Sequence, residues 1–247
     1  MKQLMILPLL LCTAFSAIAQ TPIEIINQHI EAIGGRKKIL DMKSIKTAYK
    51  YDNEFLGSGS LQLVLDVGAK IEARTMLGNM TTIVNKKKGW SIYSLTEEDK
   101  PTVEELSSTD RSLQFPSVYI DMEEQLYNEE LVSYARYNGE SKYTKAELQG
   151  RETVNNRECY KIKVNDDGDI TTWFIDVQTY YCLKKIEKND KKELVSTEYS
   201  DFRKNADGCT FPFVEKTYSE GKLLLTNTYS EIETNYKVDK SQFTYKE

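Results

Sequence analysis

The sequence predicts a mainly β protein with a single domain, on three observations. The 247 residues include 16 Tyr, 8 Phe and 2 Trp, and aromatic side chains suit a pleated, half-buried sheet surface. Hydrophobic and polar residues alternate over many short stretches, which is the period of a strand. Gly, Asn and Asp turns separate these stretches, and no Pro/Ser-rich linker divides the chain. The chain is long enough for one sizeable core.

The first 19 residues have the pattern of an export signal. Lys2 supplies a positive charge, residues 4–15 an apolar run, and Ala17-Ile18-Ala19 the small residues that a signal peptidase needs. We therefore expect cleavage before Gln20 and a periplasmic protein. The run is shorter than the roughly 20 apolar residues that span a bilayer, and we expect no transmembrane span elsewhere.

A cysteine within this signal raises the question of a lipid anchor. The residue before Cys12 is Leu11, whereas a lipid-attachment site needs Gly, Ala or Ser there. We do not expect lipidation.

After the signal, the sequence predicts an amphipathic helix over about 22–33. Thr21-Pro22 is a good helix start and Gly34-Gly35 a good stop. An apolar stripe recurs at helical spacing through Ile23, Ile26, Ile30 and Ile33. His29, the only histidine, is expected at the rim of this stripe without a catalytic partner.

Residues 43–95 have the period of antiparallel strands. Leu61, Leu63 and Leu65 alternate with other side chains, as do Ile71 and Ala73. Turn signals separate these runs.

The alternation stops over about 97–137, where we expect a helical insertion. Thr102-Val103-Glu104-Glu105 has the form of a capping box. It is expected to open a helix that carries Leu106 and Leu113, with further helix around Val118, Met122 and Leu126. The apolar faces of these helices have to be covered, and the sheet is the only large surface available.

From residue 143 onward about seven strands are expected, divided by turns of the hairpin kind. Ile170 to Ile175 is apolar on both faces around Trp173, so it is expected mid-sheet. Pro212 favours an edge or a bulge at that point.

The mature chain keeps three cysteines. Cys159 and Cys182 are placed on strands with one strand between them, roughly 9 to 10 Å apart, which exceeds disulfide reach. Together with Cys209 they are expected to be buried or half-buried thiols.

Charge and motifs exclude several function classes. A net charge of -5 leaves no excess of Lys and Arg for phosphates, so nucleic-acid binding is not expected. No phosphate loop, zinc, calcium or catalytic-serine motif occurs. We therefore expect no cofactor, no metal and no catalytic residues. A hydrolase that uses a carboxylate pair remains the weakest alternative.

The geometry of a curved sheet capped by helices suggests binding. If the helices cap the inner face without filling it, an apolar cavity suited to acyl chains results. If they fill it, the same side chains form a dry core. Periodicity alone leaves both open.

Several motifs resemble the periplasmic lipoprotein-carrier superfamily (LolA-like), of the type called outer-membrane lipoprotein-sorting proteins. The most specific are Tyr199-Ser200-Asp201-Phe202-Arg203 and Asp207-Gly208-Cys209-Thr210-Phe211-Pro212-Phe213. His29 to Gly35, Gly89-Trp90, Cys159 to Ile162 and Phe174-Ile175-Asp176 support them. The resemblance covers about residues 22–247.

The resemblance implies a half-open antiparallel β-barrel of about 11–12 strands with a helical lid. It also implies a carrier that takes acylated clients, lipoproteins or lipids, from an inner-membrane transporter to an outer-membrane acceptor. The expected cavity lining from the strands is Leu61, Leu63, Leu65, Ile71, Ala73, Trp90, Ile92, Trp173 and Ile175. The expected lining from the lid is Leu106, Leu113, Val118, Met122 and Leu126. The alternative is an envelope sensor or protein-interaction module on the same fold that carries no lipid.

Overall fold

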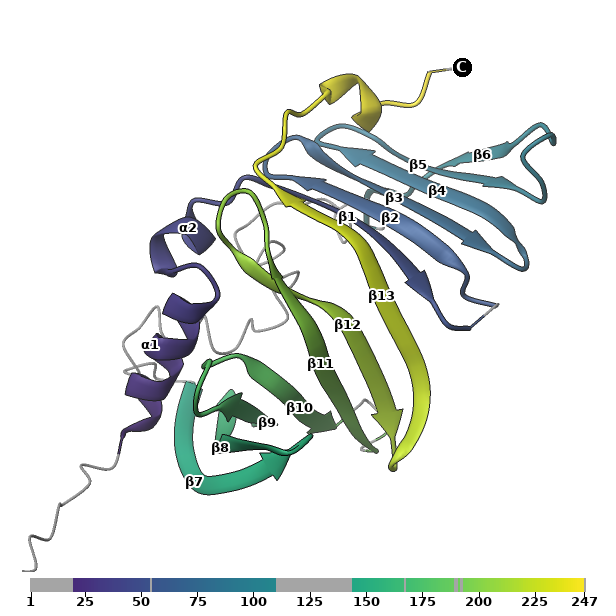
Figure 1. Ribbon diagram of the computed structural model, residues 1–247. Coiled ribbons are helices and arrows are strands. Elements are labelled where there is room, and N and C mark those ends of the chain that lie inside the picture. The colour runs from purple at the N-terminus through teal and green to yellow at the C-terminus, as the bar shows by residue number, and fades with distance from the viewer. Residues whose placement is uncertain are drawn as a thin grey trace, which may run out of the picture.

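The computed structural model describes residues 20–53, 55–109, 144–166, 168–188, 191 and 193–246. The signal segment and most of the expected lid, including Leu113, Val118, Met122 and Leu126, lie outside these residues. Over the described chain the fold is one antiparallel sheet with two α-helices and a short 3-10 helix (Figure 1). The mainly β class expected from the sequence is confirmed.

The sheet has 13 strands and does not close. Its order is β6-β5-β4-β3-β2-β1-β13-β12-β11-β10-β9-β8-β7, so β6 and β7 are its two edges. The first group is β1 (Ser44–Tyr51), β2 (Ser58–Val64), β3 (Gly68–Thr75), β4 (Gly78–Asn85), β5 (Gly89–Ser94) and β6 (Thr102–Glu105). The second group is β7 (Thr144–Val154), β8 (Arg157–Asp166), β9 (Asp169–Asp176), β10 (Cys182–Lys188), β11 (Leu194–Lys204), β12 (Thr210–Ser219) and β13 (Lys222–Thr234). This open sheet confirms the expected half-open architecture, and the second group has the seven strands expected there. The total of 13 exceeds the expected 11–12 because Thr102–Glu105 is also a strand.

The strand β6 corrects one expectation. Thr102 to Glu105 does not open a helix but pairs with β5, with Trp90 opposite Glu105 and Tyr93 opposite Thr102. A capping-box pattern of four residues is weak evidence when a neighbouring strand offers a complete row of backbone partners.

The helix α1 (Pro22–Ala32) confirms the predicted N-terminal helix. The Glu24 amide donates to Thr21 Oγ1 at 3.4 Å, and the Thr21 amide donates to the Glu24 carboxylate at 2.7 Å, which completes a capping box. A second short helix, α2 (Arg36–Leu40), follows after Gly34-Gly35. The 3-10 helix η1 (Lys240–Phe243) lies near the C-terminus.

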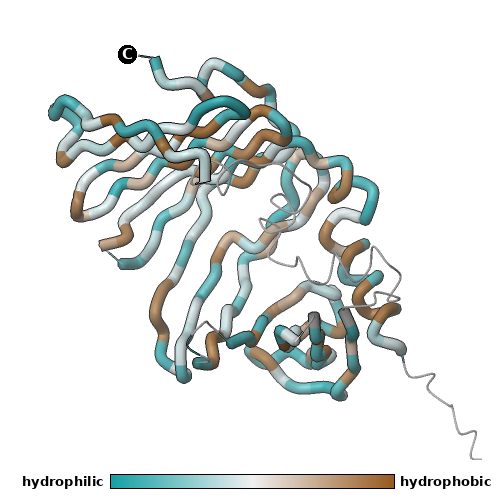
Figure 2. Tube along the Cα trace, turned by 180° about the vertical axis from the view of Figure 1, so that it is seen from behind, coloured by the Kyte–Doolittle hydropathy of each residue, from teal (hydrophilic) through white to brown (hydrophobic). Residues whose placement is uncertain are grey.

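The sheet has two faces, which we call inner and outer. The inner face carries Ile45, Leu63 and Trp173, which form one core cluster with Ile26 and Ile30 of α1. The outer face carries η1, where the Asn85 side-chain amide donates to the Phe243 carbonyl at 2.8 Å. Hydrophobic residues recur along the strands throughout the curved sheet (Figure 2).

The sheet also has two rims, because the strands alternate in direction. The helix rim carries the turns β2–β3, β4–β5, β7–β8, β9–β10 and β11–β12. The far rim carries the turns β1–β2, β3–β4, β5–β6, β8–β9, β10–β11 and β12–β13. In Figure 1, the far rim of β1–β6, β12 and β13 lies on the side away from α1 and α2.

Polar contacts made by α1 and the residues flanking it attach the helix to the helix rim. Tyr160 Oη donates to Gln20 Oε1 at 2.5 Å, and the Thr210 amide donates to the Ile33 carbonyl at 2.8 Å. His29 Nδ1 lies 2.7 Å from the Tyr180 carbonyl oxygen and must donate to it, because a carbonyl only accepts. The helix therefore covers one end of the curved sheet.

His29 is not the rim residue that its sequence neighbours indicate. Its side chain is fully buried, and its Nε2 has no partner among the described residues. His29 lies at the flank of the apolar stripe and contacts the β9–β10 turn. Helical periodicity cannot predict this contact, because the two segments are far apart in sequence.

Two expectations for the later strands are confirmed. Of the segment Ile170 to Ile175, Trp173 to Ile175 is buried on both faces, whereas Ile170 at the start of β9 is 48% exposed. Trp173 lies in the main core, and Phe174 lies in a smaller outer cluster with Cys159 and Leu183. The strand β12 pairs with β13 only from Val214 onward, so Pro212 lies where that side of the strand is unpaired. The three described cysteines are buried and free.

Burial of His29 makes the stability of the fold depend on pH. Burial lowers its pKa from 6.5 to about 4, although the bond to the Tyr180 carbonyl opposes this. Since the unfolded chain takes up the proton first, the free energy of unfolding should fall by about 3 kcal/mol as pH drops from 6.5 to 4. Chemical denaturation of wild type and His29→Asn across this range measures it. The variant should lose most of the slope, and equal slopes would contradict the prediction.

Candidate functional site

The inner face of β2 to β5 carries a continuous row of apolar side chains that becomes more exposed toward the far rim. Strand register places Leu61 opposite Ile71, Ala73 opposite Met80, and Met80 opposite Tyr93. Directly opposite residues in antiparallel strands share one face and lie about 5 Å apart. We call these five residues the apolar strip.

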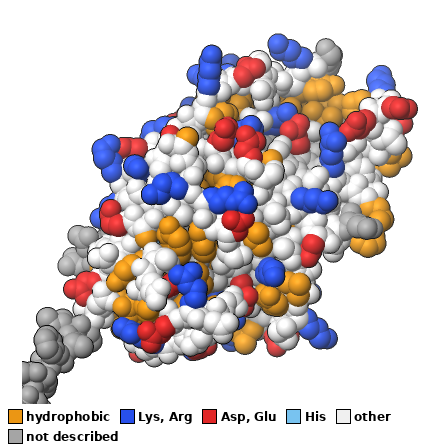
Figure 3. All heavy atoms as spheres, viewed as in Figure 1, with side chains coloured by type: hydrophobic (Ala, Val, Ile, Leu, Met, Phe, Trp, Pro, Cys, Tyr) orange, Lys and Arg blue, Asp and Glu red, His pale blue; other side chains and the backbone are white. Residues whose placement is uncertain are grey.

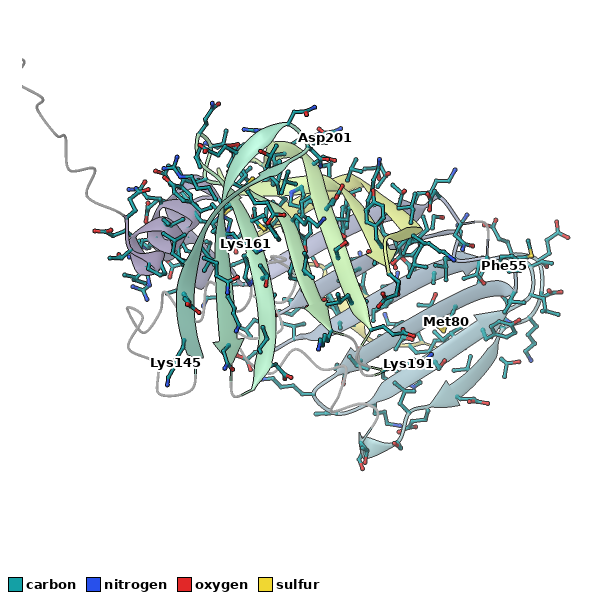
Figure 4. All side chains as sticks on the ribbon, turned by 90° about the horizontal axis from the view of Figure 1, so that it is seen from below. Phe55, Met80, Lys145, Lys161, Lys191 and Asp201 are labelled. Atoms are coloured by element: carbon teal, nitrogen blue, oxygen red, sulfur yellow. The ribbon has the colours of Figure 1, made fainter. Side chains whose placement is uncertain are left out.

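Exposure along this face follows a gradient. At the helix rim, Leu63 and Val84 are buried. Leu61 and Ile71 are half-buried, and Met80 and Tyr93 near the far rim are 43% and 41% exposed. In Figure 4, Met80 lies on the sheet and Phe55 at the end of the strands beyond it. The strip therefore connects the core to the far rim.

Tyr49 on β1 borders the apolar strip, and its side chain leaves room only for glycine at the neighbouring position 59. Its hydroxyl oxygen lies 2.6 Å from where a Cβ at Gly59 would be. Its ring contacts Tyr51 and Tyr229, with centroids 5.2 Å and 6.3 Å away. Only glycine at position 59 leaves room for this aromatic wall, and burial raises the pKa of Tyr49.

The structure divides the residues expected to line a cavity. Six of them lie on the inner face, as the strand register shows: Leu61, Leu63, Ile71, Ala73, Trp173 and Ile175. Leu65 and Leu106 are partly buried and pack against the same core cluster. The other four lid residues lie outside the described chain.

Trp90 and Ile92 lie on the outer face, contrary to the expectation that they line a cavity with Leu61. They lie opposite Ile83 and Thr81, and those residues alternate with the inner-facing Thr82 and Val84. Trp90 instead contacts Tyr245 beyond η1, with ring centroids 6.5 Å apart. Alternation within one strand does not say which parity faces inward, because that depends on pairing with distant strands.

Polar side chains interrupt the inner face on β12 and β13. Glu215 Oε2 accepts from Asn227 Nδ2 and Tyr229 Oη, each at 3.4 Å. We call these three residues the polar cluster. Asn227 Oδ1 is buried and has no partner among the described residues. The expectations from the sequence do not include this cluster, although Glu215 follows the Phe-Pro-Phe motif by two positions.

Three hollows among the described residues differ in their linings. One beside the polar cluster, between Phe211, Tyr229 and Ile232, has a volume of about 10 Å³, room for about one water molecule. Two larger ones, about 570 and 780 Å³, have mainly outer-face linings. The hollow of about 570 Å³ is lined by polar groups such as Ser60, Glu72 and Arg74. Volume alone therefore does not identify an apolar site.

The outer face around β1 to β3 and β13 carries polar side chains that form ion pairs. Lys46 lies 2.9 Å from Glu231, Lys70 lies 2.8 Å from Glu72, and Arg74 lies 2.8 Å from Glu97. Basic and acidic side chains are interspersed over the face seen in Figure 3, with hydrophobic patches between them. Exposed pairs of this kind contribute little stability each.

The described residues contain neither a metal-ligating cluster nor a membrane-spanning helix. Within them, no three His, Cys, Asp or Glu side chains are grouped so as to hold a metal ion. No helix in the described part of the chain has the length and apolar character needed to cross a bilayer.

The polar cluster predicts a second pH effect of opposite sign. Burial raises the pKa of Glu215, although hydrogen bonds from Asn227 and Tyr229 and the charge of Lys185 oppose this. A raised folded pKa means that the stability contributed by this group is lost as pH rises through it. Glu215→Gln should therefore raise the melting temperature at pH 7 but not at pH 4.

The control for this experiment is Glu147→Gln, which changes an exposed carboxylate on β7. A rise of equal size in the control, or a rise for Glu215→Gln that persists at pH 4, would contradict the assignment. Differential scanning calorimetry at the two pH values measures both variants.

Comparisons with known proteins return similar structures only. No protein-family model matches the chain, and no curated protein matches it. The chain is similar to an outer membrane lipoprotein-sorting protein domain from Vibrio parahaemolyticus, at 9% identity and TM-score 0.45 over 90% of this chain and 95% of that one. It is similar to a LolA superfamily protein from Nitrosomonas europaea, at 12% identity and TM-score 0.46 over 92% and 99%. It is also similar to a DUF1329 family protein from Desulfovibrio piger, at 10% identity and TM-score 0.46 over 92% and 98%.

Proposed function

We propose that the chain is an exported, non-enzymatic carrier or binder of acylated molecules, and that an acyl chain lies along the apolar strip. The observation that carries this proposal is the exposure gradient on the inner face. Leu61 and Ile71 are half-buried beside a fully packed core, while Met80 and Tyr93 stay exposed. An inner face that served only as a core would bury these side chains.

The dimensions of the strip suit one hydrocarbon tail. From Leu61 on β2 to Tyr93 on β5 it crosses three strand spacings of about 4.8 Å each, about 14 Å in all. Each methylene group moved from water onto such a surface contributes about 0.8 kcal/mol. A single acyl chain can therefore bind without any covalent chemistry.

Two features of the sequence support the same proposal. The expected signal would deliver the chain to the periplasm, where acylated molecules must cross an aqueous space. The Tyr199 to Phe213 motifs resemble those of lipoprotein carriers. A transporter in the inner membrane and an acceptor in the outer membrane are part of the proposal, as is release of the cleaved chain from Gln20 onward.

A fluorescent fatty-acid displacement assay tests the proposal on the chain that begins at Gln20. Leu61→Glu places a charge in the path of the tail and should weaken binding roughly tenfold or more, because it removes apolar contact equal to about two methylenes. Gln62→Glu is the matched control, since it adds the same charge one residue away on the outer face.

Binding by wild type and the control with loss in Leu61→Glu supports the proposal. Absence of uptake by wild type, or equal affinity for the two variants, would remove it. Native mass spectrometry of protein from its own envelope then separates the alternative. An interaction module with a filled inner face should show a bound protein and no lipid.

A further inference from the structure

The two rims of the sheet differ sharply in polarity. Eleven large hydrophobic residues of the described chain are exposed, between 41% and 73%. All of them lie in turns of the far rim or within three residues of a strand end there. They are Phe55, Leu56, Met76, Leu77, Met80, Tyr93, Leu95, Ile170, Leu194, Leu223 and Leu224.

The helix rim has ordinary turn chemistry. Its tips expose Asp66, Lys87, Asn155 and Asn156, which are residue types that turns favour. The far rim departs from this rule most clearly at the β3–β4 turn, where Met76 and Leu77 are 57% and 73% exposed. Hydrophobic residues in a turn break the usual preference for polar residues there, and they add no stability to the turn. Such exceptions are typical of functional surfaces.

Hydrogen bonds stabilise the conformation of the far-rim turns, in which the hydrophobic side chains are exposed to solvent. The Leu77 amide donates to Thr75 Oγ1 at 3.1 Å, and the Thr75 hydroxyl donates to the Gly78 carbonyl at 3.2 Å. Tyr93 Oη donates to the Leu77 carbonyl. The neighbouring β1–β2 tip is closed by the Gly57 amide, which donates to the Asn53 carbonyl at 2.9 Å.

We propose that the far rim is a docking surface for the lipid bilayer itself, with Phe55, Leu56, Met76 and Leu77 inserting among the lipid headgroups. This inference rests on the proposed function, because Met80 and Tyr93 belong both to this rim and to the apolar strip. A tail leaving a bilayer at the rim would thus meet hydrophobic contact all the way to Leu61.

A bilayer fits this rim better than a protein partner does. The exposed residues are spread over separate turns from β1–β2 around to β8–β9, and a lipid surface accepts any spacing between them. A protein would need a matching socket at each turn. The described residues of these turns carry six acidic side chains and two lysines, so the rim suits zwitterionic rather than anionic lipid. The eight are Asp52, Glu97, Glu98, Asp99, Lys100, Lys191, Glu193 and Glu220.

Flotation with phosphatidylcholine vesicles tests this on the chain that begins at Gln20. Wild type should float with the vesicles, and Met76→Ser/Leu77→Ser should lower the partition coefficient at least tenfold, since both changes remove apolar side chains that would be buried among the lipids. Lys86→Ser/Lys87→Ser on the helix rim is the control and should float like wild type. All the changed side chains are exposed, so melting temperatures should agree.

The same proteins separate this inference from the proposed function. In vesicle-free buffer, the Met76/Leu77 variant should bind the fluorescent fatty acid as wild type does. Fatty-acid binding without flotation would overturn the rim proposal and leave the proposed function standing. Flotation that requires phosphatidylglycerol, or equal flotation of the Met76/Leu77 variant and wild type, would also overturn the rim proposal. Crosslinking from position 77 to a membrane protein in place of lipid would overturn it as well.

Discussion

Within the described residues, the sheet of this protein stays open and ends in two edge strands, and that constraint governs the rest of the structure. A closed barrel covers its own interior, whereas a sheet that ends at β6 and β7 must have its inner face covered by other elements. The helix α1 does this at one rim, where Ile26 and Ile30 join the core and buried His29 bonds to the β9–β10 turn. Away from that helix, inner-face side chains become exposed.

Among the described elements, the helices cover the sheet at one rim only, and a polarity gradient across the molecule follows. At the helix rim, Leu63 and Val84 are buried and the turns expose charged and amide side chains. At the far rim, Met80 and Leu77 expose hydrophobic surface, and the turns hold it in place. A gradient of this kind gives a hydrocarbon tail a direction of entry, which connects the two proposals. The polar cluster around Glu215 marks the other side of the inner face, where hydrocarbon contact would be interrupted.

Much of this fold could be predicted from the sequence because helix caps and strand alternation depend only on residues that are close in sequence. The N-cap at Thr21 and the alternation around Leu61 depend on neighbouring residues, and both hold in the structure. What failed depends on contacts between distant segments: the burial of His29, the strand at Thr102, and the face taken by Trp90. The pairing of β4 with β5 decides that face, and no pattern within β5 reveals it. The exposure of Met76 at the β3–β4 turn was not predicted for a similar reason, since it depends on the position of the far rim in the whole fold.

Nuclear magnetic resonance with carbon-labelled oleate tests the central claim, that a hydrocarbon tail lies on the inner face, most directly. Intermolecular nuclear Overhauser effects should connect the acyl methylenes to the methyl groups of Leu61 and Ile71. Ile83 and Ile92, on the opposite side of the same sheet, should show none. Contacts to Ile83 and Ile92 instead, or a bound tail that touches neither pair, would contradict the claim.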